Sequence, residues 1–145
     1  MKVYLDTSVL VAALVEDHPH HAPAVAVLLS AESERAHVFI SAHGLAELYA
    51  VLTRTPFTPR IHPAEARQMI ERSVLPRVDV IALTAAEYRQ VVNECADGGF
   101  TGGVVYDAIH LRSARKAGCE RLYTLNVRDF RALAAEDFLD RICAP

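Results

Sequence analysis

Three carboxylates stand in apolar surroundings at widely separated points of the chain. Asp6 directly follows the apolar residues 3–5, Glu47 is the only charged residue between positions 44 and 53, and Asp107 follows a glycine-rich segment. A carboxylate buried among apolar residues must be paired or must bind a cation. Oxygen ligands suit hard cations such as Mg²⁺ and Mn²⁺, which activate water and neutralise charge on a phosphate. These residue types therefore predict a site that binds a divalent cation and acts on a phosphate group.

Each carboxylate also has a structural explanation. Asp6 is a suitable N-cap for a following helix, and Asp107 is a suitable first-turn acid for the helix dipole. Glu47 could belong to a solvated stripe, but the positions three and four residues later are Ala50 and Val51, which are apolar. This absence of a polar stripe favours function for Glu47 and leaves both explanations open for the other two.

Polar residues beside these carboxylates are candidates for supporting roles. Thr7 and Ser8 follow Asp6 and could orient its carboxylate or hold a water. A later segment contains Thr124, Asn126 and Asp129. Asn126 can coordinate a hard cation through its carbonyl oxygen, whereas Asp129 carries a charge but could simply cap the last helix.

The elements that must position these side chains alternate between strand and helix patterns. Strands are expected at residues 3–5, 37–40, 78–81 and 121–125, with a last edge strand at 138–142. Helices are expected at residues 7–15, 23–31, 44–53, 63–73, 84–95 and 104–117, with a short one starting near 129. This alternation predicts an α/β fold, a parallel sheet with helices on both faces. Because ligands bind at the carboxyl ends of such strands, the carboxylates should meet there.

Length and composition limit the class of protein. The chain of 145 residues suits one domain spanning 1–145, and 52% hydrophobic residues provide a core. A net charge of −3 argues against a passive nucleic-acid binder, which is usually basic. The three cysteines have no metal-binding spacing, and no apolar run is long enough to cross a membrane. We therefore expect a cytoplasmic enzyme with free thiols.

Taken together, the motifs resemble those of the PIN-domain nucleases, most closely the VapC-type toxins of bacterial and archaeal toxin–antitoxin pairs. Each motif is weak alone, but their order and spacing cover the whole chain: residues 3–8, 18–21, 46–48, 106–108 and 124–130. The resemblance implies a single PIN-like domain with strand order 3-2-1-4-5 and an endoribonuclease that requires Mg²⁺ or Mn²⁺. It also implies an RNA substrate, a homodimer and an inhibiting VapB-like antitoxin.

The resemblance also assigns the site by position. Asp6, Glu47 and Asp107 match the three acids of the family, whereas Asn126 stands where a fourth acid is usual. Asp129 is then the candidate for the missing charge. The expected catalytic residues are Asp6, Glu47, Asp107 and Asp129, the expected metal ligands are Asp6, Glu47, Asp107 and Asn126, and the expected supporting residues are Thr7, Ser8 and Thr124.

Other functions fit the sequence less well. A haloacid-dehalogenase-type phosphatase needs a second Asp two residues after the first, where this chain has Ser8. A response-regulator receiver needs an N-terminal acidic pair and a late lysine, and neither is evident. His18, His20 and His21 lack the distant partners of a zinc finger, so we expect a surface loop near the substrate path. A degenerate PIN domain that only binds a partner stays open because of Asn126.

Overall fold

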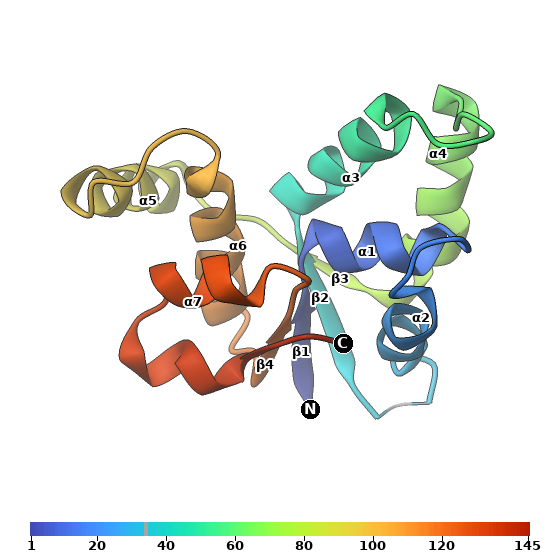
Figure 1. Cartoon of the computed structure of the whole chain (residues 1–145). Helices are drawn as coiled ribbons and strands as arrows, with labels where there is room; N and C mark the ends of the chain where they lie inside the picture. Colours follow the sequence, from blue (N-terminus) through green and yellow to red (C-terminus); the bar gives the residue numbers. More distant parts are fainter. Residues whose placement is uncertain (34) are drawn as a thin grey trace.

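Five parallel strands form the centre of the computed structural model, which describes residues 1–33 and 35–145 (Figure 1). Their spatial order is β3-β2-β1-β4-β5, which confirms the expected parallel sheet and its order. The strands are β1 (Lys2–Leu5), β2 (His37–Ser41), β3 (Asp79–Ile81), β4 (Arg121–Tyr123) and β5 (Ile142–Cys143).

The prediction of a last strand at residues 138–142 was wrong. Residues Glu136–Arg141 instead form a short 3-10 helix that buries Phe138, and β5 pairs with β4 only through Ile142 and Cys143. Phe138 is apolar, as a strand residue often is, but it lies in a helical turn. Its ring packs on the face of the sheet that α6 and α7 cover.

Within residues 1–33 and 35–145, seven α-helices connect and flank the strands, as expected. They are α1 (Thr7–Leu14), α2 (His21–Leu29), α3 (Ala42–Arg54), α4 (Pro63–Met69), α5 (Ala85–Asp97), α6 (Val104–Lys116) and α7 (Val127–Leu133). After α4 the chain continues through a π-helical turn (Ile70–Val74) and a 3-10 turn (Leu75–Arg77). Ser41 and Thr84 cap α3 and α5 through hydrogen bonds to backbone N–H groups. Asp6 caps α1 in the same way, accepting a hydrogen bond from the backbone N–H of Val9.

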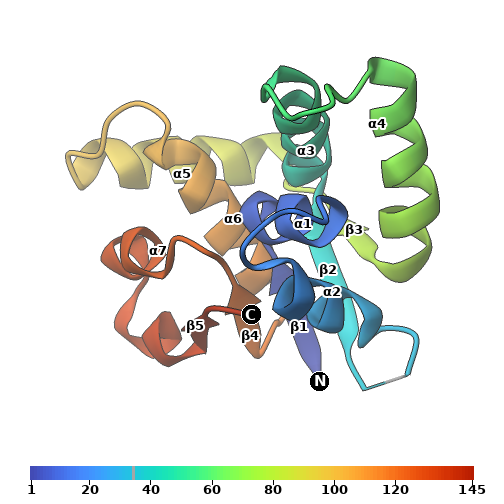
Figure 2. The same ribbon diagram turned by 45° about the vertical axis from the view of Figure 1, so that its right-hand side comes forward.

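The side chains of the strands alternate between two apolar layers. Val3 and Leu5 of β1 pack with the side chains of α1, α2, α3 and α4, whereas Tyr4 between them packs with those of α6, α7 and the 3-10 helix. Figures 1 and 2 show these helix groups on opposite faces of the sheet. Helices on both faces were expected for a parallel sheet, because each of its faces must be covered.

Within the described residues, no helix is both long enough and apolar enough to cross a membrane.

The helices α5 and α6 form a smaller apolar cluster with each other through Val91, Cys95 and Ile109. In Figure 2, α5 extends away from the sheet and α6 leads back to it. The start of α6 is therefore held near the carboxyl end of the sheet, opposite α3.

Candidate active site

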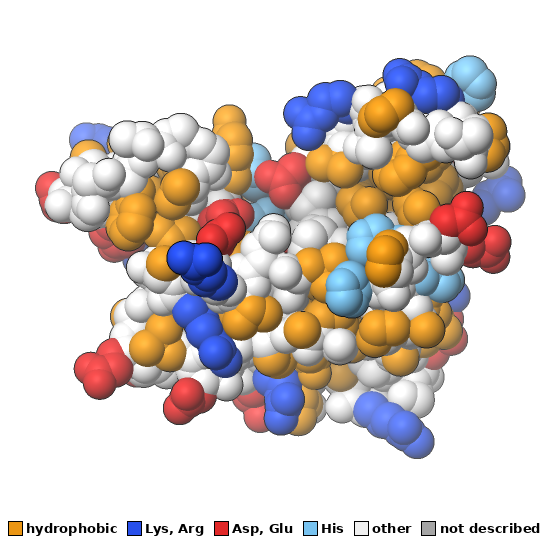
Figure 3. All heavy atoms as spheres, in the orientation of Figure 1, with side chains coloured by type: hydrophobic (Ala, Val, Ile, Leu, Met, Phe, Trp, Pro, Cys, Tyr) orange, Lys and Arg blue, Asp and Glu red, His pale blue; other side chains and the backbone are white. Residues whose placement is uncertain are grey.

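The carboxyl ends of β1 and β4 open into a hollow of about 310 Å³ between α3 and α6. Its lining includes all three predicted acids, Asp6, Glu47 and Asp107, together with the predicted Thr7, Ser8 and Asn126. Figure 3 shows acidic side chains gathered at the recess between the α5–α6 part of the surface and α3. Residues from four separate elements thus meet at the end of the sheet where the alternation of strands and helices predicted a ligand site.

Asp6 is the most deeply held of the three acids. It comes directly after β1, is only 3% exposed, and its Oδ1 accepts hydrogen bonds from Ser8 Oγ (2.5 Å) and the backbone N of Val9 (3.2 Å). Its Oδ2 accepts a hydrogen bond from Thr124 Oγ1 at 2.7 Å. Burial raises the pKa of Asp6, against the opposing effects of His110 and of these hydrogen bonds. Asp6 is therefore both the helix cap and a wall of the hollow.

Two hydroxyl groups join the end of β1 to the segment after β4. Ser8 Oγ donates to Asp6 and accepts from the backbone N of Leu125 at 3.0 Å. Thr124 Oγ1 likewise donates to Asp6 and accepts from the backbone N of Asn126 at 2.9 Å. Because each hydroxyl accepts a hydrogen bond from a backbone N–H group, its own proton points to Asp6. Ser8 and Thr124 together thus orient the carboxylate of Asp6.

Glu47 projects from α3, whose Leu48 and Leu52 are fully buried against the sheet. Its carboxylate is held by two histidines: His43 Nε2 lies 3.1 Å from Oε2, and His110 Nε2 lies 3.3 Å from Oε1. Burial raises the pKa of Glu47, but the hydrogen bonds from His110, Thr7 and His43 outweigh burial and lower the pKa to about 2. Glu47 is therefore ionised throughout the neutral range.

His110 joins Glu47 to the interior of the protein. It is 2% exposed, and its Nδ1 lies 2.8 Å from the hydroxyl of Tyr4, which is fully buried. Burial raises the pKa of Tyr4, so its hydroxyl keeps its proton. A Cβ at Gly44 would lie 3.1 Å from His110 Cε1 and 3.0 Å from Ser41 Oγ. Glycine at this position allows the close approach of α3 to the imidazole of His110.

Asp107 lies in the first turn of α6, facing the same hollow. Within the described residues, no hydrogen bond to its carboxylate is found, unlike Asp6 and Glu47. Burial raises the pKa of Asp107 to about 6, with further contributions from the charges of Asp6, Glu47 and Asp129 and an opposing one from His110. Asp107 is thus the acid in this site that gains most from a nearby cation.

Asn126 and Asp129 occupy different positions relative to the hollow. Asn126 precedes α7 and lines the hollow, with a side chain that makes no capping bond. Asp129 is exposed and does not line the hollow, although its charge is close enough to raise the pKa of Asp107. The geometry therefore favours Asn126 over Asp129 as the fourth group in direct reach of a ligand.

Sequence reasoning missed two side chains behind the site: His43 holds Glu47, and Tyr4 holds His110. His18, whose loop was expected near the substrate path, lines the hollow from the loop after α1. The spacing of His43 and Glu47, four residues apart on one helix, was a usable signal, because such residues share a helix face. Nothing in the pattern of β1 distinguished the buried hydroxyl of Tyr4 from ordinary core packing.

The donor set of the hollow fits a hard divalent cation. Asp6, Glu47 and Asp107 offer carboxylate oxygens and Asn126 offers an amide oxygen, which are the ligand types that Mg²⁺ and Mn²⁺ prefer. Burial raises the pKa of Asp107 and the charges of Asp6, Glu47 and Asp129 add to the shift, so a cation at this position would stabilise its ionised form. These residues could hold one or more such ions.

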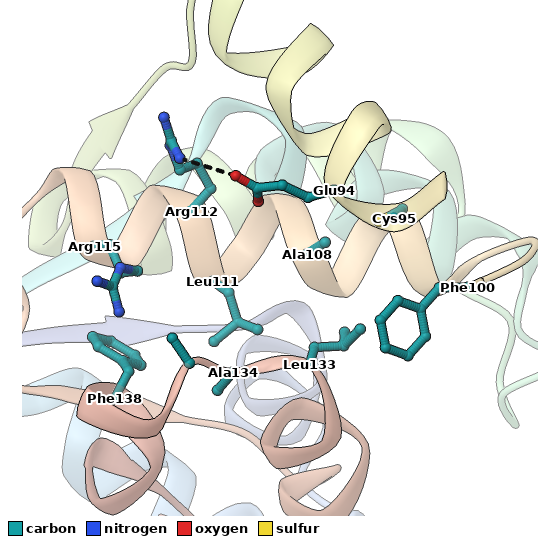
Figure 4. Close-up of a pocket in the computed structure, with 11 residues that line it drawn as sticks. Glu94, Cys95, Phe100, Ala108, Leu111, Arg112, Arg115, Leu133, Ala134 and Phe138 are labelled. Carbon is teal, nitrogen blue, oxygen red and sulfur yellow. Dashed lines mark ion pairs between the residues drawn. The ribbon is translucent and has the colours of Figure 1, made fainter. Parts of the chain in front are cut away.

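A second pocket lies on the other side of α6, as Figure 4 shows. It is lined mainly by apolar side chains such as Leu111, Leu133 and Phe138, with Arg112 near Glu94 and Arg115 at its rim. It contains no cluster of carboxylates or nucleophiles. The chemistry of the protein is therefore expected at the carboxylate hollow.

Comparisons with known proteins agree with this assignment. The PIN domain family matches residues 3–136 of this chain. Ribonuclease VapC40 of Mycobacterium tuberculosis (strain CDC 1551 / Oshkosh) is 35% identical over 128 residues, 88% of this chain and 87% of the relative. Ribonuclease VapC27 of Mycobacterium tuberculosis (strain H37Rv) is 34% identical over 129 residues, 88% of this chain and 85% of the relative.

Solved structures share the fold. VapC20 of Mycobacterium tuberculosis superposes with a TM-score of 0.69 at 22% identity, covering 92% of this chain and 97% of the other. FitAcB of Neisseria gonorrhoeae gives 0.63 at 22% identity, covering 90% and 92%. Sequence identities this low show only that the fold is shared. The PIN-domain match and the VapC relatives, at 34–35% identity, show the family. The chain belongs to the PIN-domain family.

Proposed function

We propose that this chain is an endoribonuclease that requires a divalent cation, Mg²⁺ or Mn²⁺, and acts as the toxin of a toxin–antitoxin pair. The observation that carries the proposal is the meeting of Asp6, Glu47 and Asp107 at one hollow. The relatives VapC40 and VapC27 are named ribonucleases, and the structural neighbour VapC20 is named a sarcin-ricin loop cleaving toxin. Which RNA this chain cleaves is a separate question from the chemistry.

The residues of the hollow have different roles in the proposed hydrolysis. Asp6, Glu47 and Asp107 would hold the cation, and Asn126 would be available as a neutral ligand. A bound divalent cation supplies an activated water and neutralises charge that develops on the phosphate. Ser8 and Thr124 keep the Asp6 carboxylate in one orientation, which loss of either hydroxyl would relax.

The surroundings of the hollow suit a phosphate backbone. His18 lines the hollow, and Arg128 is exposed close behind Asn126 in the chain. The exposed Gly102 and Gly103 precede α6 and let a substrate backbone approach the start of that helix. Contacts of this kind position RNA without reading its sequence.

The decisive experiment measures RNA cleavage by the purified protein with Mg²⁺, with Mn²⁺ and with excess chelator. We expect cleavage only with a cation, and products with 5′-phosphate and 3′-hydroxyl ends, because an activated water does not need the RNA 2′-hydroxyl. Full activity in chelator, or 2′,3′-cyclic phosphate ends, would show a metal-free acid–base mechanism instead.

The Asp6→Asn variant distinguishes a nuclease from a degenerate PIN domain that only binds a partner. If the chain only binds a partner, wild type and Asp6→Asn would both leave RNA intact. If it is a nuclease, wild type cleaves and the variant loses at least about a hundredfold in rate, as expected for a lost metal ligand. The three acids at one hollow favour the nuclease, and nothing in the described structure favours the binding module.

The proposed partners are a VapB-like antitoxin and a second copy of this chain. An arginine or lysine from the antitoxin could enter the hollow and pair with Glu47 and Asp107, since such pairs are strong when desolvated. Co-expression with the neighbouring reading frame, followed by substitution of each basic residue in its C-terminal segment, tests this arrangement. Inhibition that survives every such substitution would reject the arginine mechanism. Sedimentation of the chain alone tests the homodimer.

A further inference from the structure

Beside the oxygen-rich hollow lies a cluster of different chemistry, formed by His43, Glu47 and His110. His43 and Glu47 are one helical turn apart on α3, and His110 faces them from α6. Each residue offers one ligand atom, and the three atoms lie within 4.8 Å of one another. We call this set the histidine–glutamate cluster. It shares Glu47 with the three acids but adds two imidazole nitrogens.

We propose that the histidine–glutamate cluster is a second metal site, which takes zinc or a similar borderline transition-metal ion rather than magnesium. Two imidazole nitrogens and one carboxylate oxygen are ligands that Zn²⁺ prefers, whereas Mg²⁺ prefers oxygen alone. Three protein ligands leave a fourth position of a tetrahedral site for water. This site shares Glu47 with the carboxylate site but differs from it in its other two ligands and in its ion.

The distances fit such an ion. His43 Nε2 and His110 Nε2 lie 3.1 Å and 3.3 Å from the oxygens of Glu47. Two ligands of a tetrahedral zinc ion stand about 3.3 Å apart, which follows from zinc–ligand bonds of about 2.0–2.1 Å. Each histidine–glutamate pair therefore has about the spacing of one edge of a zinc tetrahedron, and the three ligand atoms lie within 4.8 Å of one another. Because the two histidines contact different oxygens of Glu47, its carboxylate must turn to present one oxygen to both imidazoles.

The surroundings of the two imidazoles favour binding. When His110 Nε2 binds a metal, Nδ1 carries the proton and donates it to the hydroxyl oxygen of Tyr4, 2.8 Å away. Metal-binding histidines are usually held in this way by a second hydrogen bond. The ring of His43 is stacked on Tyr106, with centroids 5.0 Å apart and planes 16° apart. Both imidazoles are therefore held in place before any ion arrives.

The sharing of Glu47 has a consequence for activity. An ion in the histidine–glutamate cluster engages the carboxylate that the Mg²⁺ or Mn²⁺ of the proposed nuclease site also needs. Zinc should therefore inhibit RNA cleavage at a fixed Mg²⁺ concentration. This consequence rests on the proposed function, whereas the binding of zinc itself does not.

The test of binding uses the full-length protein freed of metal and then supplied with excess Mg²⁺ and titrated with Co²⁺. Four-coordinate Co²⁺ absorbs visible light far more strongly than six-coordinate Co²⁺. We expect an intense band that Zn²⁺ bleaches by displacement, with one ion per chain. In His43→Gln, the band should vanish or the affinity should fall at least about tenfold. His62→Gln, which changes an exposed histidine outside the cluster, should match wild type.

Circular dichroism first confirms that His43→Gln is folded, which its partly exposed position allows. A weak six-coordinate spectrum in wild type, or equal Co²⁺ affinity in wild type and His43→Gln, would overturn the proposal. Inhibition is then measured against each variant's own Mg²⁺-supported rate, and zinc should inhibit wild type more strongly than His43→Gln. If the chain proves not to cleave RNA, the Co²⁺ spectrum still decides whether the site exists.

Discussion

Glu47 and Asp107 face one hollow from α3 and α6, yet their surroundings shift their pKa values in opposite directions. Glu47 is 27% exposed and is held by His43 and His110, and its pKa falls to about 2. Burial and neighbouring acids raise the pKa of Asp107 to about 6, with no hydrogen-bond donor on its carboxylate among the described residues. The carboxylate of Asp107 at the start of α6 thus lacks a partner that stabilises its charge among the described residues, whereas the carboxylate of Glu47 on α3 has two.

This difference separates two ways of preparing a metal site. The α3 side is organised in advance, because histidines keep Glu47 ionised and oriented. The α6 side is organised by the cation, since only a positive charge removes the repulsion around Asp107. Two carboxylates with the same proposed role should therefore respond alike in activity and differently in stability.

The largest expected effect concerns activity. Glu47→Gln and Asp107→Asn should each lower the rate of RNA cleavage at least about a hundredfold, because each removes a charged ligand of the cation. The control is Asp140→Asn, a change of an exposed acid outside the hollow, which should leave the rate unchanged. Cleavage assays under saturating Mg²⁺ measure all three. A near-normal rate in either of the first two variants would remove that residue from the proposed site.

A smaller effect is expected at the hydroxyl that orients Asp6. Thr124→Val removes the donor to Asp6 Oδ2 and leaves the backbone N–H of Asn126 without its acceptor. We expect about a tenfold loss of cleavage rate, typical of a residue that orients a metal ligand, and a loss of about 1–3 kcal/mol in the free energy of unfolding.

Thr124→Ser is the matched control, since it keeps the hydroxyl and removes only a methyl group. Recovery of the rate in this variant would assign the effect to the hydrogen bonds. Equal loss in both variants would instead point to packing around the buried Thr124.

The parallel sheet and the place of the site were accessible from the sequence for a physical reason, because apolar strands followed by polar residues indicate the carboxyl ends of a parallel sheet, and these ends must lie together. The strand order and the match of Asp107 to the other two acids came instead from the resemblance to PIN-domain nucleases. Asp6 illustrates the limit of this logic: its capping and its place in the hollow are compatible, so the two explanations were never alternatives.

The histidines and the last strand show what patterns leave out. The contact of His110 with Glu47 joins residues 63 positions apart, and it depends on the close approach of α3 and α6 at Gly44. No local periodicity encodes that approach. Likewise, the burial of Phe138 in a 3-10 turn depends on the packing of α6 and α7 around it, so its apolar character alone suggested a strand.

The smallest expected effect, on stability without metal, tests the comparison most directly. The pKa of Asp107 is raised from 3.8 to about 6 on folding, so its protonated form stabilises the fold below about pH 4 and this contribution is lost as pH rises through 6. The pKa of Glu47 is lowered from 4.5 to about 2, so its contribution is present above pH 4.5 and is lost as pH falls towards 2.

Thermal unfolding in chelator at pH 4 and pH 7 therefore distinguishes the two sides of the hollow. Asp107→Asn mimics the neutral carboxyl, so its Tm should match wild type at pH 4 and exceed it at pH 7. Glu47→Gln should lie below wild type at pH 7, because the neutral amide loses the charge-assisted bonds to His43 and His110, and this deficit should shrink as the pH falls below about 4. If the Tm of both variants rose above wild type at pH 7, repulsion among the acids, and not the bonds to the histidines, would dominate the contribution of Glu47 to stability.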